Sequence, residues 1–385
     1  MDVSHPLLDT AHAMAADFAR RSAEIEACRK LPVDVARRMG VAGFFRMFVE
    51  EQKGGLEVAP GLAARIYEAL ARGDAACGWI AFIGATSGLA LCRVPDDAAR
   101  DILATPETLI AGVFAASGDA QKVPGGFRVN GRWQFGSGSP NAEWIGGGCT
   151  LTVDGKRLTS SAGVPRNHML LFRAADVELL DTWYTAGLRG TGSTDFAVHD
   201  VFVPEVRASG YLIKDVPERP LFRFPQFALL GHGVTAVAMG VARASIEELV
   251  RLAGEKKRYG TAVTLANRPH SQVEVALAEA RLRSARAFFY ETIDAAWSVA
   301  QAGEPVSIDL RRDMRLATTH ALQASLAVVD AMYTLAGGTA VYDSSPLQRH
   351  LRDVHVASQH ITVSTNTLET IGQLLLGVEA NTATL

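Results

Sequence analysis

The spacing of apolar residues changes twice along the chain, and this change restricts the folds that it can adopt. From residue 7 to about 104 the apolar residues recur every three or four positions, which predicts amphipathic helices. From about 108 to 206 short apolar runs are separated by turn residues, which predicts strands. The helical spacing then returns in four long runs, which are Pro225–Tyr259, Ser271–Gln301, Ile308–Leu335 and Asp353–Leu376. We therefore predict an α+β protein with an N-terminal helical domain at 1–107, a central β-barrel or β-sandwich domain at 108–217 and a C-terminal four-helix bundle at 218–385.

Turn residues predict where the hairpins of the central domain lie. Asn130-Gly131 is placed between two apolar runs and is the strongest hairpin signal in this region. Asp154-Gly155 predicts a second turn. Phe196–Val203 is predicted as a late strand that ends at Pro204, because proline cannot donate a hydrogen bond to a neighbouring strand.

Composition excludes several classes of function. The 385 residues carry 38 Lys and Arg against 41 Asp and Glu, and this balance of −3 gives no electrostatic attraction to nucleic acid or to an anionic membrane. The longest apolar run, Trp79–Cys92, is shorter than the roughly 20 residues that cross a bilayer. The four cysteines lie far apart, which argues against disulfides and zinc and for a reducing compartment. The N-terminus lacks a basic segment before an apolar run, so we expect a cytoplasmic protein.

Common catalytic motifs are absent from the sequence, and two apparent matches have simpler explanations. There is no phosphate-binding loop, zinc-protease helix or nucleophile elbow. Gly231–Ala236 matches a dinucleotide fingerprint, but it lies in a helical run, where glycines favour close helix packing. His355 and His360 are five residues apart and point to different helix faces, so we expect no metal site.

Three segments resemble motifs of the acyl-CoA dehydrogenase family, in the order that the family has them. They are Leu31–Phe44 with the following Gly54-Gly55-Leu56, Gly187–Pro204, and Ala336–Asp353. The resemblance covers nearly the whole chain and implies the fold of that family, which has the three parts predicted above. It also implies a homotetramer, in which the stretch at Gly337-Gly338 contributes to flavin binding across a subunit interface.

A missing carboxylate separates this chain from the dehydrogenases that it resembles. Those enzymes remove a proton with a glutamate that follows the Arg-Asp pair, but after Arg352-Asp353 this chain has His360 and no carboxylate before Glu369. The family's other glutamate position falls near Glu255, among basic residues. Without such a base a dehydrogenase loses about 10²–10⁴-fold in rate. The histidine is similar to that of two-component flavin-dependent monooxygenases. The alternatives are a dehydrogenase-like desaturase, a member that oxygenates nitrogen or sulfur, and a flavin-binding protein without activity.

The resemblance to that monooxygenase branch implies a mechanism and a set of residues. Reduced FMN or FAD, supplied by a separate flavin reductase, reacts with O2 to give a C4a-hydroperoxyflavin that hydroxylates a small cyclic or aromatic substrate. His360 is the expected base, and Ser137 bonds the flavin or the substrate. The expected flavin-binding residues are Ser117, Trp133, Phe135, Ser137, Gly138, Ser139, Arg189, Ser193, Lys256 (or Arg258), Gly337 and Gly338. The expected substrate-binding residues are Thr86, Ser87 and Phe224.

Each of these residues also has a purely structural interpretation. Trp133 follows a turn signal and fits a cross-strand core position. The serines at 137 and 139 fit turn chemistry, and Gly337-Gly338 fits the end of a helix. Several aromatic hydroxylases of the branch carry a second histidine on the helix after Gly78-Trp79, where this chain has none, and its absence argues against a phenolic substrate.

Overall fold

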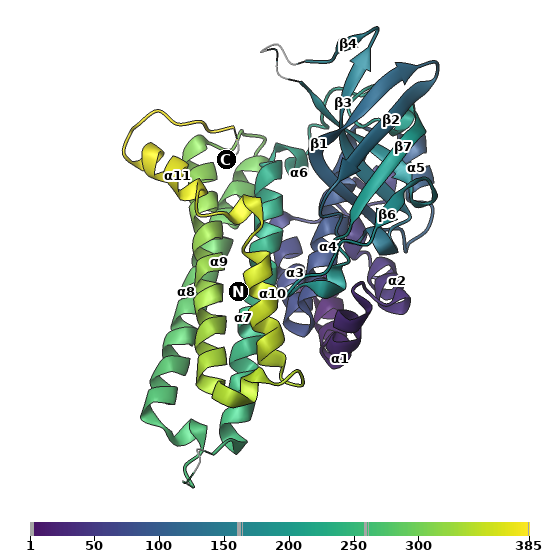
Figure 1. The fold of residues 1–385 in the computed structure, drawn as a ribbon. Helices are drawn as coiled ribbons and strands as arrows, with labels where there is room; N and C mark the ends of the chain where they lie inside the picture. Colours follow the sequence, from purple (N-terminus) through teal and green to yellow (C-terminus); the bar gives the residue numbers. More distant parts are fainter. Residues whose placement is uncertain (1–3, 160–162, 164, 258–259, 261, 384) are drawn as a thin grey trace.

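Five helices form the N-terminal part of the computed structural model, which describes residues 4–159, 163, 165–257, 260, 262–383 and 385 (Figure 1). They are α1 (Pro6–Cys28), α2 (Val33–Val41), α3 (Pro60–Gly73), α4 (Ala75–Gly88) and α5 (Asp96–Ile102). Local sequence explains their starts: Pro6 and Pro60 stand in first turns, and Asp74 accepts hydrogen bonds from Ala76 N and Cys77 N at the start of α4.

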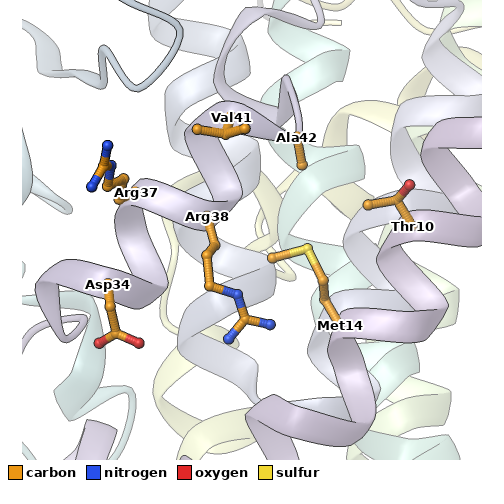
Figure 2. Close-up of a pocket in the computed structure, with 7 residues that line it drawn as sticks. All are labelled: Thr10, Met14, Asp34, Arg37, Arg38, Val41 and Ala42. Carbon is orange, nitrogen blue, oxygen red and sulfur yellow. The ribbon is translucent and has the colours of Figure 1, made fainter.

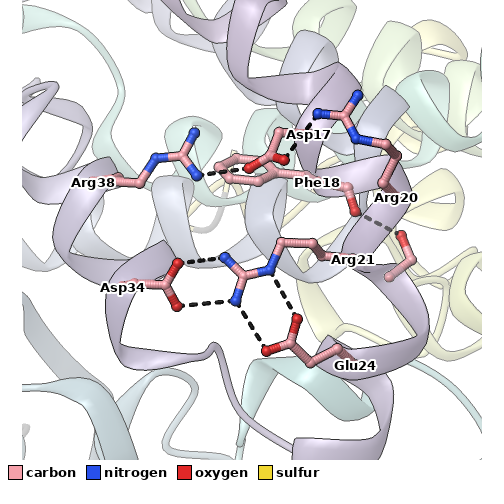
Figure 3. A network of polar contacts seen from close by, with 8 residues as sticks. Asp17, Phe18, Arg20, Arg21, Glu24, Asp34 and Arg38 are labelled. Atoms are coloured by element: carbon pink, nitrogen blue, oxygen red, sulfur yellow. Dashed lines mark hydrogen bonds and ion pairs between the residues drawn. The ribbon is translucent and has the colours of Figure 1, made fainter.

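Ion pairs attach α2 to α1 on the outer surface (Figure 3). Arg21 of α1 pairs with Asp34 of α2 and with Glu24, while Arg38 of α2 lies 2.6 Å from Asp17. Exposed pairs of this kind contribute about 0–1 kcal/mol each, so the buried apolar faces of the two helices supply most of the stability.

The central part is one mixed seven-stranded sheet in the order β4-β3-β1-β2-β7-β6, with β5 paired to β3. Its strands are β1 (Ile110–Val123), β2 (Gly126–Trp133), β3 (Trp144–Val153), β4 (Lys156–Arg157), β5 (Asn167–Arg173), β6 (Glu178–Leu180) and β7 (Asp195–Pro204). The β1–β3 pair is parallel and the other pairs are antiparallel. The predicted strand before Pro204 and the turn at Asp154-Gly155, which joins β3 to β4, are confirmed.

The hairpin predicted at Asn130-Gly131 is wrong. The β2 strand runs through both residues, and the turn between β1 and β2 includes Gly125, whose φ is +78°. A Cβ at Gly131 would lie 2.8 Å from Gly118 Cα, so glycine serves a close approach of two strands. Asn130 instead accepts a hydrogen bond from the backbone N–H of Asp200, at a bulge in the β2–β7 pairing.

The C-terminal part is a bundle of long helices beside the sheet (Figure 1). Its helices are α6 (Pro220–Arg223), α7 (Gln226–Glu255), α8 (Pro269–Gln301), α9 (Ile308–Ala336), α10 (Pro346–Ala357) and α11 (Thr367–Leu375). The fourth predicted run was wrong between 358 and 366, because α10 and α11 are separate. The single turn η10 (Ile361–Val363) lies between them, and the side chain of His360 accepts a hydrogen bond from Thr362 N there. Such local bonds compete with a continuous helix.

Three helical segments are long and apolar enough to cross a membrane by length and composition alone: Ala75–Arg93, Gln226–Glu255 and Ile308–Val341. In the first two, 72% and 78% of the most apolar stretch is buried inside the protein, and in the third 39%. The glycine-rich start of α7 packs closely, since a Cβ at Gly233 would lie 2.6 Å from Phe82 of α4. The packing interpretation of Gly231–Ala236 is therefore confirmed, and α7 joins both helical parts into one core.

Candidate active site

A chain of hydroxyl groups lies where the sheet meets α4. Trp79 Nε1 donates to Ser137 Oγ at 3.0 Å, and this oxygen lies 2.6 Å from Ser193 Oγ. Ser193 Oγ is in turn 2.6 Å from Thr191 Oγ1, which donates to Leu188 O. Because each hydroxyl has one proton, this last bond fixes the direction of the whole chain. Ser137 donates to Ser193, and its remaining capacity is to accept a hydrogen bond from a ligand N–H or O–H.

His360 also contacts Trp79. The two rings are 5.9 Å apart between centroids and meet edge to face. His360 Nδ1 is 2.8 Å from Thr362 Oγ1 and accepts a hydrogen bond from Thr362 N. Burial lowers the pKa of His360 to about 4, so its imidazole is neutral at pH 7. The predicted pair of His360 and Ser137 is thus brought together around one tryptophan.

The hydrogen bonds of His360 define two neutral forms of its ring. When Thr362 N–H donates to Nδ1, the ring proton is on Nε2. In the other form Nδ1–H donates to Thr362 Oγ1, whose hydroxyl can accept, and Nε2 then carries the free electron pair of a base. Thr362 is therefore placed to set which nitrogen of His360 takes a proton.

The Arg-Asp pair anchors the loop that carries the hydroxyl chain. Asp353 Oδ1 accepts a hydrogen bond from Leu188 N at 2.6 Å, three residues before Thr191. Burial raises the pKa of Asp353 to about 7. Arg352 lies 2.5 Å from Glu26 of α1, so the two residues fasten α10 to two other elements.

An exposed aromatic surface adjoins the hydroxyl chain and fits a flat ring system. Phe135 exposes 67% of its surface and has a φ of +64°, a conformation that costs free energy for a residue with a side chain. Nearby in sequence, Ser139 Oγ is buried and has no hydrogen-bond partner within the described residues. A flavin supplies both an apolar face for Phe135 and polar edge atoms for the serines, so the residues present fit that group.

Trp133 is a correction to the predicted flavin site. It is fully buried among the side chains of the sheet, where its indole stacks on Phe196 at 5.0 Å. Its Nε1 donates to Gly148 O at 2.9 Å. The stacked ring and the satisfied N–H leave no group of Trp133 directed at a ligand, so we assign it to the core of the sheet.

The other predicted residues are spread over the fold. Ser117 is exposed on β1, and Arg189 is exposed with its Nε donating to Thr185 O. Thr86 Oγ1 donates to Phe82 O within α4, next to the partly buried Ser87. Gly138 has a φ of +79° in the loop between Phe135 and Ser139, and Phe224 is buried beside α7. None of these positions is excluded as a ligand contact, except that Thr86 already uses its hydroxyl proton.

Three predicted flavin residues gather at the opposite end of the bundle. Lys256 Nζ donates to Ala336 O, and a Cβ at Gly337 would lie 3.7 Å from that same nitrogen. Gly338 follows in the sequence, whereas Arg258 lies outside the described residues. Gly233, near the start of α7, packs against Phe82, which contacts Trp79 of the hydroxyl chain, whereas Lys256 follows the end of the same helix. At 1.5 Å per residue the two ends of this stretch are about 35 Å apart. These residues therefore cannot contact the same flavin ring as Ser137 of their own chain.

Four residues of the site were not predicted as ligands: Trp79, Thr191, Thr362 and Arg315. Arg315 is only 8% exposed in α9, and its Nη1 donates to Thr362 O. The sequence does show Trp79 after a glycine and Thr362 two residues after His360. Only the fold reveals that these side chains meet.

A solvent-open pocket lies elsewhere, between α1 and α2 (Figure 2). It has a volume of about 590 Å³ and is lined by Thr10, Met14, Asp34, Arg37, Arg38, Val41 and Ala42. It is open to solvent and contains no residue of the hydroxyl chain. Hydrogen-bonded groups, not cavity size, therefore locate the candidate site.

Burial of a second histidine, His232 of α7, gives a testable dependence of stability on pH. Burial, and then the charge of Arg315, lower the pKa of His232 to about 3. An unfolded histidine titrates near 6.5, so the unfolded chain binds more protons below that pH. We expect His232 to remove about 1.4 kcal/mol of unfolding free energy per pH unit as pH falls below 6.5. Urea unfolding at pH 7 and 5 should show a smaller fall in His232→Leu; equal falls would contradict the assignment.

Comparisons with known proteins cover nearly the whole chain. Two family descriptions match: acyl-CoA dehydrogenase, N-terminal domain, over 4–100, and acyl-CoA dehydrogenase, C-terminal domain, over 232–365. An indole-3-acetate monooxygenase of Pseudomonas putida is 36% identical over 93% of this chain and 90% of its own length. The oxygenase subunit HsaA of a flavin-dependent monooxygenase from Mycobacterium tuberculosis is 27% identical over 88% of this chain and 87% of its own. A crystal structure of 3-HSA hydroxylase from Rhodococcus sp. RHA1 superposes with a TM-score of 0.87, at 25% identity over 99% and 100% of the two chains.

Proposed function

Since this chain belongs to the acyl-CoA dehydrogenase family, in its branch of flavin-dependent monooxygenases, we propose that it hydroxylates a small aromatic substrate of the indole type. The observation that carries the proposal is the Ser137–Trp79–His360 cluster beside the exposed Phe135. Indole-3-acetate, the substrate named for the Pseudomonas putida relative, is the first compound to test. The absence of a second histidine on α4 agrees with a substrate that has no phenolic hydroxyl.

Bound reduced flavin supplies two electrons to O2, so that one oxygen atom enters the substrate and the other leaves as water. Phe135 would pack against the flavin ring, and Ser139 would pair its buried hydroxyl with a polar edge atom. Ser137 would accept a hydrogen bond from an N–H of the reduced ring, because Ser193 already takes its proton. Trp79 holds Ser137 in place and separates the hydroxyl chain from His360.

His360 would accept the proton that the substrate loses. In the form whose Nδ1–H donates to Thr362 Oγ1, its Nε2 is a base that is free at neutral pH. The desaturase alternative lacks a corresponding group, because Glu369 on α11 and Glu255 at the end of α7 are both exposed. Among the described residues neither carboxylate joins the cluster around Trp79.

The reduced flavin would come from a separate reductase, because the HsaA relatives are described as oxygenase subunits of a flavin-dependent monooxygenase.

We further propose a cytoplasmic homotetramer. Val341 and Tyr342, which follow Gly338, expose 66% and 69% of their surface and would be covered by another subunit. In that assembly Lys256, Gly337 and Gly338 would serve the flavin of a neighbouring chain. Sedimentation at the mass of one chain would contradict the tetramer, and activity in a membrane fraction would contradict the location.

Photoreduced flavin tests the proposed function without any reductase. We expect anaerobically reduced FMN or FAD, mixed with the protein, indole-3-acetate and air, to give hydroxylated product with little hydrogen peroxide. Adding a reductase with NADH should change the supply of flavin but not the product. Release of all electrons as hydrogen peroxide with each aromatic compound tried would contradict the proposal.

A further inference from the structure

His232 is a buried polar side chain without a hydrogen-bond partner. It is 3% exposed, and neither ring nitrogen makes a hydrogen bond within the described residues. The partly buried His350 differs, because its Nδ1 lies 3.1 Å from Ser245 Oγ. A neutral imidazole has one donor and one acceptor, and leaving both unpaired inside a protein costs free energy. A missing ligand is the natural explanation of such a pair of atoms.

Two aromatic rings border His232. Phe224 and Phe289 meet its ring edge to face, at centroid distances of 5.9 and 5.4 Å. Phe224 was predicted from the sequence as a substrate-binding residue, and it lies in the apolar contact that would receive an aromatic ring. The imidazole is thus a polar group within an apolar, aromatic surrounding.

A positive charge also lies close to His232. Arg315 is buried, and it is near enough to His232 to influence the titration of its ring. A Cβ at the neighbouring Gly231 would lie 3.5 Å from Arg315 Nη1 and 3.5 Å from Thr362 O. Glycine at this position keeps the space between α7 and the guanidinium free of a side chain.

Thr362 connects this charge to the candidate base. Its carbonyl oxygen accepts from Arg315 Nη1, while its hydroxyl lies 2.8 Å from His360 Nδ1. One residue therefore separates Arg315 from the atom that sets the proton position of His360. A small substrate whose reacting atom lies near His360 would have its far end near Arg315 and His232.

Resting on the proposed function, we propose that His232 and Arg315 form the subsite that binds the carboxylate of an aromatic alkanoic acid. The guanidinium supplies the charge, and His232 donates one N–H to the same group. Phe224 and Phe289 supply apolar contact for the ring system. The pair selects substrates that carry an acidic side chain over those with the same ring and no acid.

Binding measurements without flavin or oxygen test this subsite. Equilibrium dialysis would compare indole-3-acetate with 3-methylindole, which has the same ring system and no carboxylate. We expect wild type to prefer the acid by about tenfold or more, and His232→Leu to lose most of that preference through about tenfold weaker binding of the acid alone. His232→Gln, which keeps an N–H donor, should retain part of it. The control is His320→Leu, since His320 is exposed on α9 and should leave both affinities unchanged.

The thermal melt of the ligand-free variant gives a second readout. Removal of two unpaired buried nitrogens should leave the melting temperature of His232→Leu at or above that of wild type. A loss of stability with equal weakening of both ligands would show a structural role and overturn the inference. Should His232→Leu fail to fold, His232→Gln decides by the same comparison. A protein that prefers the acid but does not oxygenate it would refute the proposed function alone, and oxygenation without the preference would refute the subsite alone.

Discussion

Replacing His360 by alanine should lower the rate of product formation by about 10²–10⁴-fold, which is the usual contribution of a positioned general base. The affinity for reduced flavin should stay within twofold of wild type, because Ser137 and Phe135 remain. The electrons should then appear as hydrogen peroxide. Rapid mixing of prereduced flavin with the variant, the substrate and O2 measures both products.

Two further variants separate proton transfer from packing. Thr362→Val keeps the shape of the side chain but removes the hydroxyl that lies 2.8 Å from His360 Nδ1, and we expect about a tenfold loss of rate. Thr362→Ser should restore most of it. The matched control is His355→Gln, since His355 lies within α10, before the turn that carries His360, and pairs with Asp330 at 2.8 Å. If His360→Ala formed product at the wild-type rate without releasing extra hydrogen peroxide, the assignment of His360 as the base would be wrong.

The second large effect that we expect is a loss of stability on replacing Trp133, in contrast to a loss of flavin affinity on replacing Phe135. Trp133→Ala should lower the free energy of unfolding by about 3–5 kcal/mol, because it removes a fully buried indole from the sheet. Phe135→Ala should leave that free energy nearly unchanged, since its ring is 67% exposed. It should weaken flavin binding by about tenfold through the loss of an aromatic contact. Urea unfolding and equilibrium dialysis of flavin measure the two quantities.

The opposite pattern would contradict this division. If Trp133→Ala remained as stable as wild type and lost flavin affinity, the indole would have to reach the ligand, contrary to its stacking on Phe196. Trp133→Phe is the milder control: it keeps an aromatic ring in the core and should lose less stability than the alanine variant.

Alternation explains why the sequence could not distinguish these two aromatic residues. Residues two apart in a strand share a face, so apolar spacing alone treats Trp133 and Phe135 alike, and both were predicted to bind the flavin. The β2 strand ends at Trp133, and the positive φ of Phe135 turns its side chain out of the sheet. A positive φ at a phenylalanine cannot be predicted from the spacing of apolar residues in the sequence.

Turn dipeptides predicted the hairpins correctly where only neighbouring residues determine the backbone conformation. They failed where a segment distant in sequence pairs with the same residues. Asp154-Gly155 forms its turn where a Cβ on Gly155 would meet no atom of the described residues within 4 Å, whereas Asn130-Gly131 lies within β2, against Gly118 and Asp200. The family resemblance pointed to His360, Ser137 and Ser193, and the fold places Ser137 and Ser193 in contact and His360 against Trp79. The resemblance could not show Trp79 between them, because that contact joins α4 to η10 and to the sheet.

The direction of the hydroxyl chain is also a property of the fold. Ser137, Ser193 and Thr191 are 56 and 2 residues apart in sequence, and any of them alone fits turn chemistry. Their order becomes defined only because Thr191 donates to Leu188 O, in a loop that Asp353 holds from the other side. Asp353 of the Arg-Asp motif therefore affects the hydroxyl chain indirectly, because it fixes the backbone of the loop that carries Thr191.

The origin of the oxygen atom in the product tests the central claim most directly. The protein would be mixed with photoreduced flavin and indole-3-acetate under oxygen-18 gas in ordinary water, and the product analysed by mass spectrometry. The account predicts one atom of oxygen-18 in each molecule of hydroxylated product. A product whose new oxygen comes from water, or a product that is desaturated and carries no new oxygen, would contradict it.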